Sequence, residues 1–368
     1  MSRLHVQNLA GYGPRYHLPM PTNIGTAGIT GDLPGFIPTD GFWHPEGRHY
    51  IAMGAGNATV YLYNSITDVF TRHQQFLGGQ PRGAINRVGD RIAGVTANNL
   101  QVLAFDPVTG NLSADVILTD TARFSHARSC AWDPTGEFIA VANETDSSPF
   151  SQISIIRYVR SPASLTVVAE RIGVFGESRL SVDWSRQDII VATGLQLDIW
   201  MMTFDRVTNA LTLVSRTGGG VRSPLAVAFD STGEFLAELR TDGIGTHGIS
   251  IWRYTPSPHS LTLLVDVFPP PGAGNIWYQT AVPRGKVSWD WTSRFIFTNK
   301  GIGTVNSNLG IFEFDPVTFG LRLWRTFAHH PVIDTMIIHP HGNLLAVSRR
   351  VNETPYVMGL PWSSRVIN

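Results

Sequence analysis

The sequence predicts an all-β protein built from repeated four-stranded antiparallel units. Short segments rich in Val, Ile, Thr and aromatic residues alternate between apolar and polar positions, and Asp/Pro/Gly turns separate them. No segment has the spacing of a long amphipathic helix. The same strand–turn–strand pattern recurs seven times, at intervals of about 42 to 62 residues, which is the period of a propeller blade. The predicted fold class is therefore an all-β, seven-bladed β-propeller of four-stranded antiparallel blades.

Each repeat begins with two strands joined by a polar turn. In "SCAWDPTGEFIAVA" (129–142) an apolar strand ends in an aromatic residue, a turn containing Gly follows, and a second apolar strand begins. The residues taken to end the first strand of each copy are the anchors Trp43, Ile85, Trp132, Trp184, Phe229, Trp291 and Ile338.

The rest of each repeat supplies a third strand, a turn and a fourth strand. Segments such as "LQVLAF" (100–105), "DPVTGN" (106–111) and "LTLVSR" (211–216) illustrate these three parts. The predicted organisation is an N-terminal strand and arm over 1–40, followed by a propeller over 41–368. Its blades are expected near 41–80, 81–125, 126–176, 177–220, 221–270, 284–328 and 329–368.

The seventh repeat ends after its third strand, within "TPYVMGLPW" (354–362). We expect "LHVQNL" (4–9) to supply the missing fourth strand, because this pairing would close the ring and remove two exposed sheet edges. The alternative is an N-terminal arm that does not pair.

Two segments depart from the repeat. Residues 10–40 are rich in Gly and Pro and are expected to form an extended arm. Residues 268–285 form a Pro/Gly loop that carries Trp277 and Tyr278. These aromatic side chains either pack on a neighbouring blade or contact a partner, and both interpretations stay open.

Composition excludes several classes of function. The 368 residues carry zero formal net charge, which argues against binding nucleic acid or an anionic membrane through bulk charge. Cys130 is the single cysteine, so no internal disulfide forms. No signal peptide or membrane span is recognisable, so we expect a soluble protein made in the cytoplasm without Sec export. No P-loop, dinucleotide fingerprint or EF-hand loop is present, and no cofactor or metal is predicted.

Basic residues precede most of the predicted first strands, which line the channel of a propeller. They could converge on one channel mouth and bind a carboxylate, a phosphate or an acidic partner loop, because guanidinium groups bind oxyanions in a bidentate manner. The alternative is that they are solvated, since Arg is the common basic residue of this chain. These residues are Arg82, Arg128, Arg179, Arg222, Arg284 together with Lys286, and His330.

The third repeat, "HARSCAWDPTGEFIAVANE", resembles the "GPRH…HPxG…vNE" blade of the lactonase-type propellers, the 6-phosphogluconolactonases and carboxymuconate lactonizing enzymes. The resemblance implies that Arg128 and Glu144 face an active-site mouth. The chain departs from the family at "QPRG" (80–83), where Arg82 stands in place of the catalytic histidine motif, and at Ser129, which replaces the His of "PRH". Arginine stays protonated and cannot carry the proton that lactone chemistry needs.

Three hypotheses follow. The first is a non-catalytic binding or structural propeller within a larger protein assembly, such as a phage tail or virion, and we favour it because the acid–base set is incomplete. The second is a lactonase-type enzyme for an anionic sugar lactone or muconolactone, in which Arg128 and Arg222 hold the anion and Glu144 with His126 transfers protons. The third, a WD40-like scaffold, is less favoured because the Trp-Asp pairs lie at the turn rather than at the end of a third strand.

Overall fold

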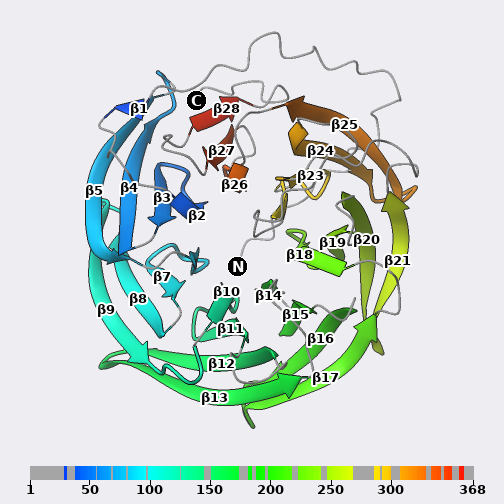
Figure 1. Cartoon of the computed structure of the whole chain (residues 1–368), viewed down its shortest axis with the longest axis horizontal. Coiled ribbons are helices and arrows are strands. Elements are labelled where there is room, and N and C mark those ends of the chain that lie inside the picture. Colours follow the sequence, from blue (N-terminus) through cyan, green and yellow to red (C-terminus); the bar gives the residue numbers. More distant parts are fainter. Residues whose placement is uncertain are drawn as a thin grey trace, which may run out of the picture.

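The computed structural model is a ring of β-sheets, and no helix occurs among the residues it describes (Figure 1). The described residues are 29–30, 38–54, 56–67, 69–79, 82–96, 98–124, 126–144, 151–173, 181–184, 188–194, 198–217, 223–241, 247–267, 286–290, 292–299, 307–328, 333–340, 344–349 and 356–359.

Consecutive antiparallel strands form each sheet, and the described strands form seven sheets in chain order. The inner strands are β2 (Pro38–Trp43), β6 (Arg82–Ile85), β10 (His126–Trp132), β14 (Val182–Trp184), β18 (Ser223–Phe229), β22 (Val287–Trp289) and β26 (Ile333–Ile338). The second strands are β3 (His49–Gly54), β7 (Arg91–Val95), β11 (Phe138–Glu144), β15 (Ile189–Gly194), β19 (Phe235–Thr241), β23 (Phe295–Thr298) and β27 (Leu344–Arg349).

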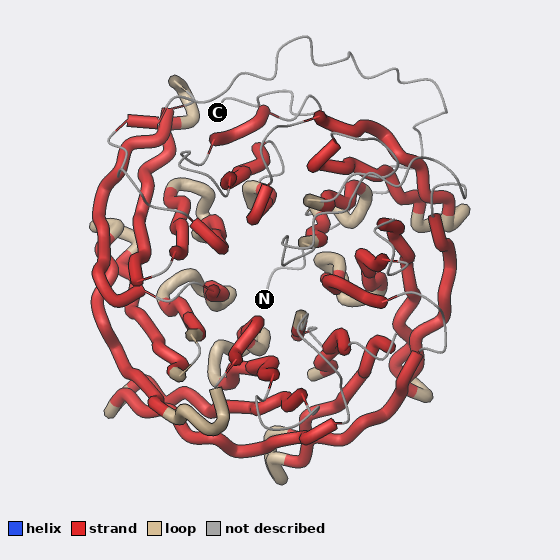
Figure 2. Tube along the Cα trace, in the orientation of Figure 1, coloured by secondary structure: helices blue, strands red, loops and turns tan. Residues whose placement is uncertain are grey.

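The third and fourth strands, labelled in Figure 1, form the outer part of the ring, which Figure 2 shows in the same orientation. The third strands are β4 (Gly56–Asn64), β8 (Asn99–Asp106), β12 (Ser151–Arg160), β16 (Asp198–Asp205), β20 (His247–Pro256), β24 (Ser307–Asp315) and β28 (Tyr356–Gly359). The fourth strands are β5 (Val69–Gly79), β9 (Asn111–Thr119), β13 (Ala163–Gly173), β17 (Ala210–Thr217), β21 (His259–Val267) and β25 (Gly320–Ala328). We number the sheets as blades one to seven, from the sheet that contains β2 to the sheet that contains β26.

The inner strands neighbour one another around the whole ring. Each contacts the inner strand of the next blade, and β26 contacts β2, which brings the last sheet beside the first. The all-β propeller prediction is therefore confirmed. The strand expected at 4–9 lies outside the described residues. A feature that the sequence did not predict is β1 (Ile29–Thr30), which pairs in parallel with Phe70 and Thr71 of β5 and adds a fifth strand to blade one.

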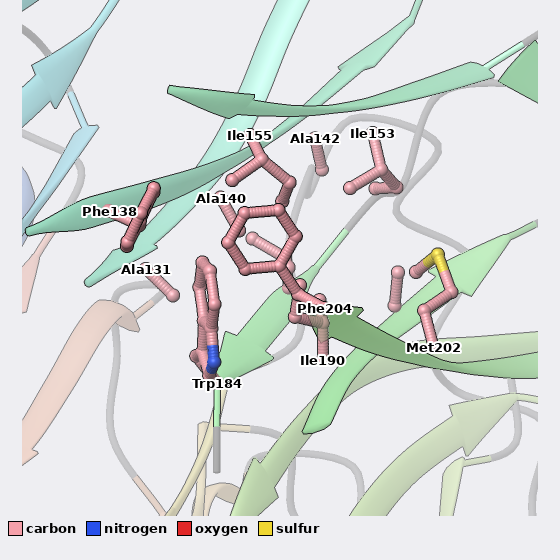
Figure 3. Packing of buried hydrophobic residues seen from close by; sticks show 12 residues of the cluster. Ala131, Phe138, Ala140, Ala142, Ile153, Ile155, Trp184, Ile190, Met202 and Phe204 are labelled. Carbon is pink, nitrogen blue, oxygen red and sulfur yellow. The ribbon is translucent and has the colours of Figure 1, made fainter. Parts of the chain in front are cut away.

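Apolar side chains fill the seams between blades. Between blades three and four, Phe204 packs edge-on against Phe138 and Trp184, with ring centroids 5.0 and 5.7 Å apart (Figure 3). Small residues such as Ala140 and Ala142 face these rings and make room for them. Neighbouring sheets are thus held by side-chain packing, because the backbone hydrogen bonds run within each sheet.

The turn between the first and second strands is built around a buried aspartate. The Oδ1 atom of Asp133 accepts hydrogen bonds from the backbone N–H groups of Glu137 and Phe138, at 2.8 and 2.7 Å. Asp230 and Asp290 make the same pair of bonds four and five residues ahead. Gly136 of this turn has a φ of 75°, in the left-handed region that glycine adopts without strain. The aspartate of "DPTGE" (133–137), which recurs in "DSTGE" (230–234) and "DWTSR" (290–294), therefore shapes the turn.

This turn corrects one anchor. The inner strand of blade six ends at Trp289, which directly precedes Asp290, so Trp289 is the counterpart of Trp132 and the prediction of Trp291 was wrong. The hydrogen bonds agree. The indole N–H of Trp132 donates to the carbonyl of Ala84 at 3.0 Å, and that of Trp289 donates to the carbonyl of Ala228 at 2.9 Å. Each tryptophan therefore joins its blade to the preceding one.

The outer strands share an irregularity. Midway along the pairing of the third and fourth strands, the register shifts by one residue in each of blades one to six. Such bulges increase local twist and make a strand edge a poor template for pairing with another chain.

Candidate functional site

The residues that lie three positions before the end of each inner strand occupy equivalent places in the seven sheets, near the end of the ring where the inner strands begin. We call this set the mouth layer. It consists of Asp40, Arg82, Ser129, Ser181, Ala226, Lys286 and Thr335.

Three side chains of the mouth layer reach the following blade. The Oδ2 atom of Asp40 accepts from the N–H of Gly83 at 3.4 Å. The guanidinium of Arg82 donates to the carbonyl of Ala127. The Oγ atom of Ser129 accepts from the N–H of Val182 at 3.4 Å. These bonds link blades one to four in sequence at the mouth, so Arg82 is engaged with protein backbone.

An ion pair joins blades six and one within the same layer. The ammonium of Lys286 lies 3.0 Å from Oδ1 of Asp40. The backbone of Lys286 is fixed in turn, because its N–H donates to Oδ1 of Asn299 at 2.7 Å and its carbonyl accepts from the N–H of Asn299 at 3.2 Å. Asp40 is buried, and the Lys286 side chain is one-third exposed. The positive charge that Lys286 brings to the mouth is therefore balanced by a buried carboxylate.

The thiol of Cys130 lies behind this layer. Burial raises its pKa to about 12, the negative charge of Asp40 adds to the effect, and Lys286 opposes it. Because the thiolate is the nucleophilic form, Cys130 has no role as a nucleophile at neutral pH.

The register brings the predicted catalytic residues to one end of β10 and β11. His126 and Glu144 are direct cross-strand partners, and Arg128 is the extra residue of a bulge between Ala127 and Ser129. Bulges are frequent beside active sites because they redirect a side chain. The side chains of His126 and Glu144 are not among those described. The remaining predicted binding residues lie outside the described part of the chain: Arg179, Arg222, Arg284, Trp277 and Tyr278.

Sequence reasoning missed two polar residues here. Asp40 could have been found by counting three residues back from Trp43, as for Arg82 and Ile85. Asn143 lies opposite Ala127 and is fully buried, and neither its Nδ2 nor its Oδ1 atom has a hydrogen-bond partner among the described residues. Buried amides of this kind are costly unless a water or a ligand satisfies them.

Two further kinds of site receive no support from the described residues. No group of three or more His, Cys, Asp or Glu side chains among them could hold a metal ion. The described part of the chain also contains no helix long and apolar enough to cross a membrane.

Replacing Lys286 by Met is expected to lower the free energy of unfolding by about 1–3 kcal/mol, because it leaves the buried carboxylate of Asp40 without its partner. Urea unfolding measures the loss. The double variant Asp40→Asn, Lys286→Met should recover part of it, since the unpaired charge is then removed. Arg322→Met, which breaks a far more exposed ion pair with Glu313, should cost less than about 0.5 kcal/mol. An equal loss in Lys286→Met and Arg322→Met would contradict the assignment.

Comparison with known proteins places the fold but not the chemistry. No protein-family model and no curated protein matches the sequence. Among solved structures, the 6-phosphogluconolactonase-like protein of Bacteroides uniformis has a TM-score of 0.66 at 14% identity, over 82% of this chain and 88% of that one. Its counterpart from Bacteroides fragilis has a TM-score of 0.62 at 14% identity, over 82% and 85%. The Cps50 (Swd1) β-propeller domain of Myceliophteria thermophila has a TM-score of 0.62 at 12% identity, over 92% and 100%. The chain is thus a β-propeller whose fold resembles those of lactonase-like and WD40-type propellers.

Proposed function

We propose that this propeller is a non-catalytic binding module and a structural component of a larger protein assembly, of the kind found in phage tails and virions. One observation carries the proposal. Where a lactonase-type enzyme needs a free proton carrier, Arg82 is bonded to the Ala127 carbonyl, and Lys286 is paired with Asp40 across the mouth. The described charges of the mouth layer therefore hold the blades together.

The opposite face offers contacts suited to a protein partner. The turns between third and fourth strands carry an aliphatic residue at the same position in four blades, and the neighbouring Asp or Asn and Thr side chains make the bonds that shape each turn. The aliphatic residue contributes only its backbone N–H to these bonds, and its side chain is almost fully exposed. These tips are Ile66 (83%), Val108 (83%), Val207 (91%) and Val317 (83%). We infer that a partner protein contacts these four side chains, which occupy equivalent turns of four blades.

The proposal is tested by sedimentation of the native protein from its source, followed by mass spectrometry of the particle. We expect the native protein to sediment as part of a stoichiometric multiprotein assembly. The fourfold variant Ile66→Ser, Val108→Ser, Val207→Ser, Val317→Ser should no longer be incorporated into that assembly. Ile117→Ser with Leu263→Ser, two exposed aliphatic positions on outer strands, is the matched control and should remain assembled. A free monomer in the native source would contradict the structural role.

A lactonase-type enzyme is the second candidate. The unsatisfied amide of Asn143 favours it, because Asn143 lies opposite Ala127, beside the bulge that carries Arg128. The purified protein is assayed on a panel of sugar lactones and muconolactones, with Arg128→Ala and Glu144→Ala alongside. We expect no turnover above the uncatalysed rate. Turnover that both variants abolish would overturn the non-catalytic proposal in favour of the enzyme.

A further inference from the structure

Histidines are concentrated where blade one meets blade two. His44 follows β2, His49 begins β3, and His73 lies on β5. The side chains of His44 and His49 are almost completely buried. Their rings are 5.9 Å apart, and both pack against Phe105 of blade two, at 5.4 and 5.2 Å. Two imidazoles therefore form part of an apolar seam.

The hydrogen bonds require these rings to be neutral. Nδ1 of His44 accepts from the N–H of Glu46 at 3.2 Å, so the ring proton is on Nε2. That Nε2 atom and Nδ1 of His49 are buried without a partner. A protonated imidazole needs an acceptor at both nitrogens, and the described surroundings offer none to these two atoms.

The seam has no room for a counter-ion beside these rings. A Cβ atom placed on Gly89 of blade two would lie 2.2 Å from Nε2 of His44. One placed on Gly110 would lie 3.1 Å from Nε2 of His49 and 3.0 Å from Cδ2 of His73. Both glycines have positive φ, at 90° and 75°. The backbone of blade two, at Gly89 and Gly110, therefore packs directly against the histidine rings.

The charges around the seam do not favour an imidazolium. Burial, with the smaller effects of His44, Arg48 and His73, lowers the pKa of His49 to about 4, whereas Glu46 opposes them. Burial also lowers the pKa of His44. The carboxylate of Glu46 lies 4.0 Å from His44 but is largely exposed.

The other carboxylates of the seam have partners of their own. Asp90 bonds to Asn86 and Arg160. Asp106 accepts from the backbone and hydroxyl of Thr109. Both carboxylates are therefore already hydrogen-bonded, and neither serves as a counter-ion for a protonated histidine ring.

The same turn is held from the other side by blade seven. His339, which follows β26, makes a hydrogen bond of 2.8 Å between its Nε2 and the carbonyl of Gly47, and its ring packs edge-on against Trp43 at 4.6 Å. Residues 44–49, which we call the histidine turn, thus lie between the first and last blades of the ring and touch blade two as well. This is the place where the two ends of the chain's propeller meet.

We propose that the histidine turn is a pH-sensitive contact between blades. Protonation of His44 and His49 separates blade one from blade two, and the ring opens at this seam before the other blades unfold. In the unfolded chain these histidines take up protons near their ordinary pKa of about 6.5, whereas the folded seam holds them neutral. Folding stability is therefore fully present at neutral pH and falls as the pH drops from about 6.5 towards 4. For His49 alone, the pKa difference raises the unfolding equilibrium constant by roughly 100-fold between pH 7 and pH 4.

Hydrogen exchange of the full chain, corrected for the intrinsic effect of pH, locates the opening. At pH 5 we expect peptides from residues 41–54 and 86–112 to lose protection, while peptides from blades four and six keep theirs. Uniform loss of protection, or opening first at another seam, overturns the proposal.

A variant series tests the assignment to these side chains. His49→Phe retains a ring against Phe105, and His44→Gln retains an acceptor for the N–H of Glu46. In His49→Phe, the rise in the unfolding constant between pH 7 and 4.5 should be at least tenfold smaller than in the natural chain, and in His44→Gln it should also be smaller. His259→Gln is the control, because His259 bonds to Tyr254 in blade five, away from the histidine turn, and should keep the natural pH dependence. Unchanged pH dependence in His49→Phe overturns the proposal. If that variant does not fold, the exchange pattern of the natural chain decides.

Discussion

Replacing Trp132 by Ala is expected to lower the free energy of unfolding by about 3–5 kcal/mol. The Trp132 side chain is buried in the seam between blades two and three, where its ring packs edge-on against Tyr158 with centroids 5.7 Å apart. Truncation leaves a large cavity, because sheets fixed on both sides cannot close around it. The carbonyl of Ala84 also loses its donor. Urea unfolding followed by fluorescence and circular dichroism measures the loss.

A matched pair of substitutions separates the hydrogen bond from the packing. Trp184 occupies the same position in blade four, and its ring packs edge-on against Phe204, also at 5.7 Å, but its buried N–H has no acceptor. Both Trp→Phe changes remove a similar volume, and only Trp132→Phe removes a hydrogen bond. We expect Trp132→Phe to cost about 1 kcal/mol more than Trp184→Phe. Equal costs would show that the bond to Ala84 contributes nothing to the seam.

Repetition explains why the sequence predicted the architecture well. A pattern seen in one blade can be checked in the next, so a weak strand signal gains support from its copies. The text around Trp289 shows the limit. "SWDWTS" offers two tryptophans on either side of one aspartate, and alternation alone does not choose between them. The buried aspartate shows which tryptophan ends the inner strand. Asp290 accepts from the N–H of Phe295 in the turn, so the strand ends just before it, at Trp289.

The candidate site was harder to predict because it depends on contacts between blades. Asp40 in blade one and Lys286 in blade six are far apart in the chain. Their side chains meet only once the folded ring brings these two blades to either side of blade seven. The bond from Arg82 to the Ala127 carbonyl likewise depends on which face of the inner strand is turned towards the next blade. Where an inner strand carries a bulge, the bulge changes that orientation, and a pattern of alternating residues does not reveal where an extra residue stands. The bulge at Arg128 is an example.

Asp133→Ala is the second substitution with a large expected effect, a loss of about 3–5 kcal/mol in the free energy of unfolding. The Asp133 side chain is fully buried and accepts from three backbone N–H groups, those of Thr135, Glu137 and Phe138. It also lies 2.7 Å from the guanidinium of Arg206, which reaches across from blade four. Alanine leaves these donors without an acceptor, and the N–H of Phe138 is buried from water. The loss therefore combines one buried N–H group, two partly buried ones and one partner of an ion pair between blades.

Asp106→Ala is the matched control, because Asp106 makes similar bonds to the N–H groups of Val108 and Thr109 in a fully exposed turn. Water can replace the carboxylate there, so its loss should be far smaller than that of Asp133. Arg206→Met removes only the contact between blades and should give an intermediate loss. If Asp133→Ala cost no more than Asp106→Ala, the aspartate of the "DPTGE" turn would be acting as an ordinary surface turn residue. The observed burial argues otherwise, since an unpaired N–H group costs most where no solvent can satisfy it.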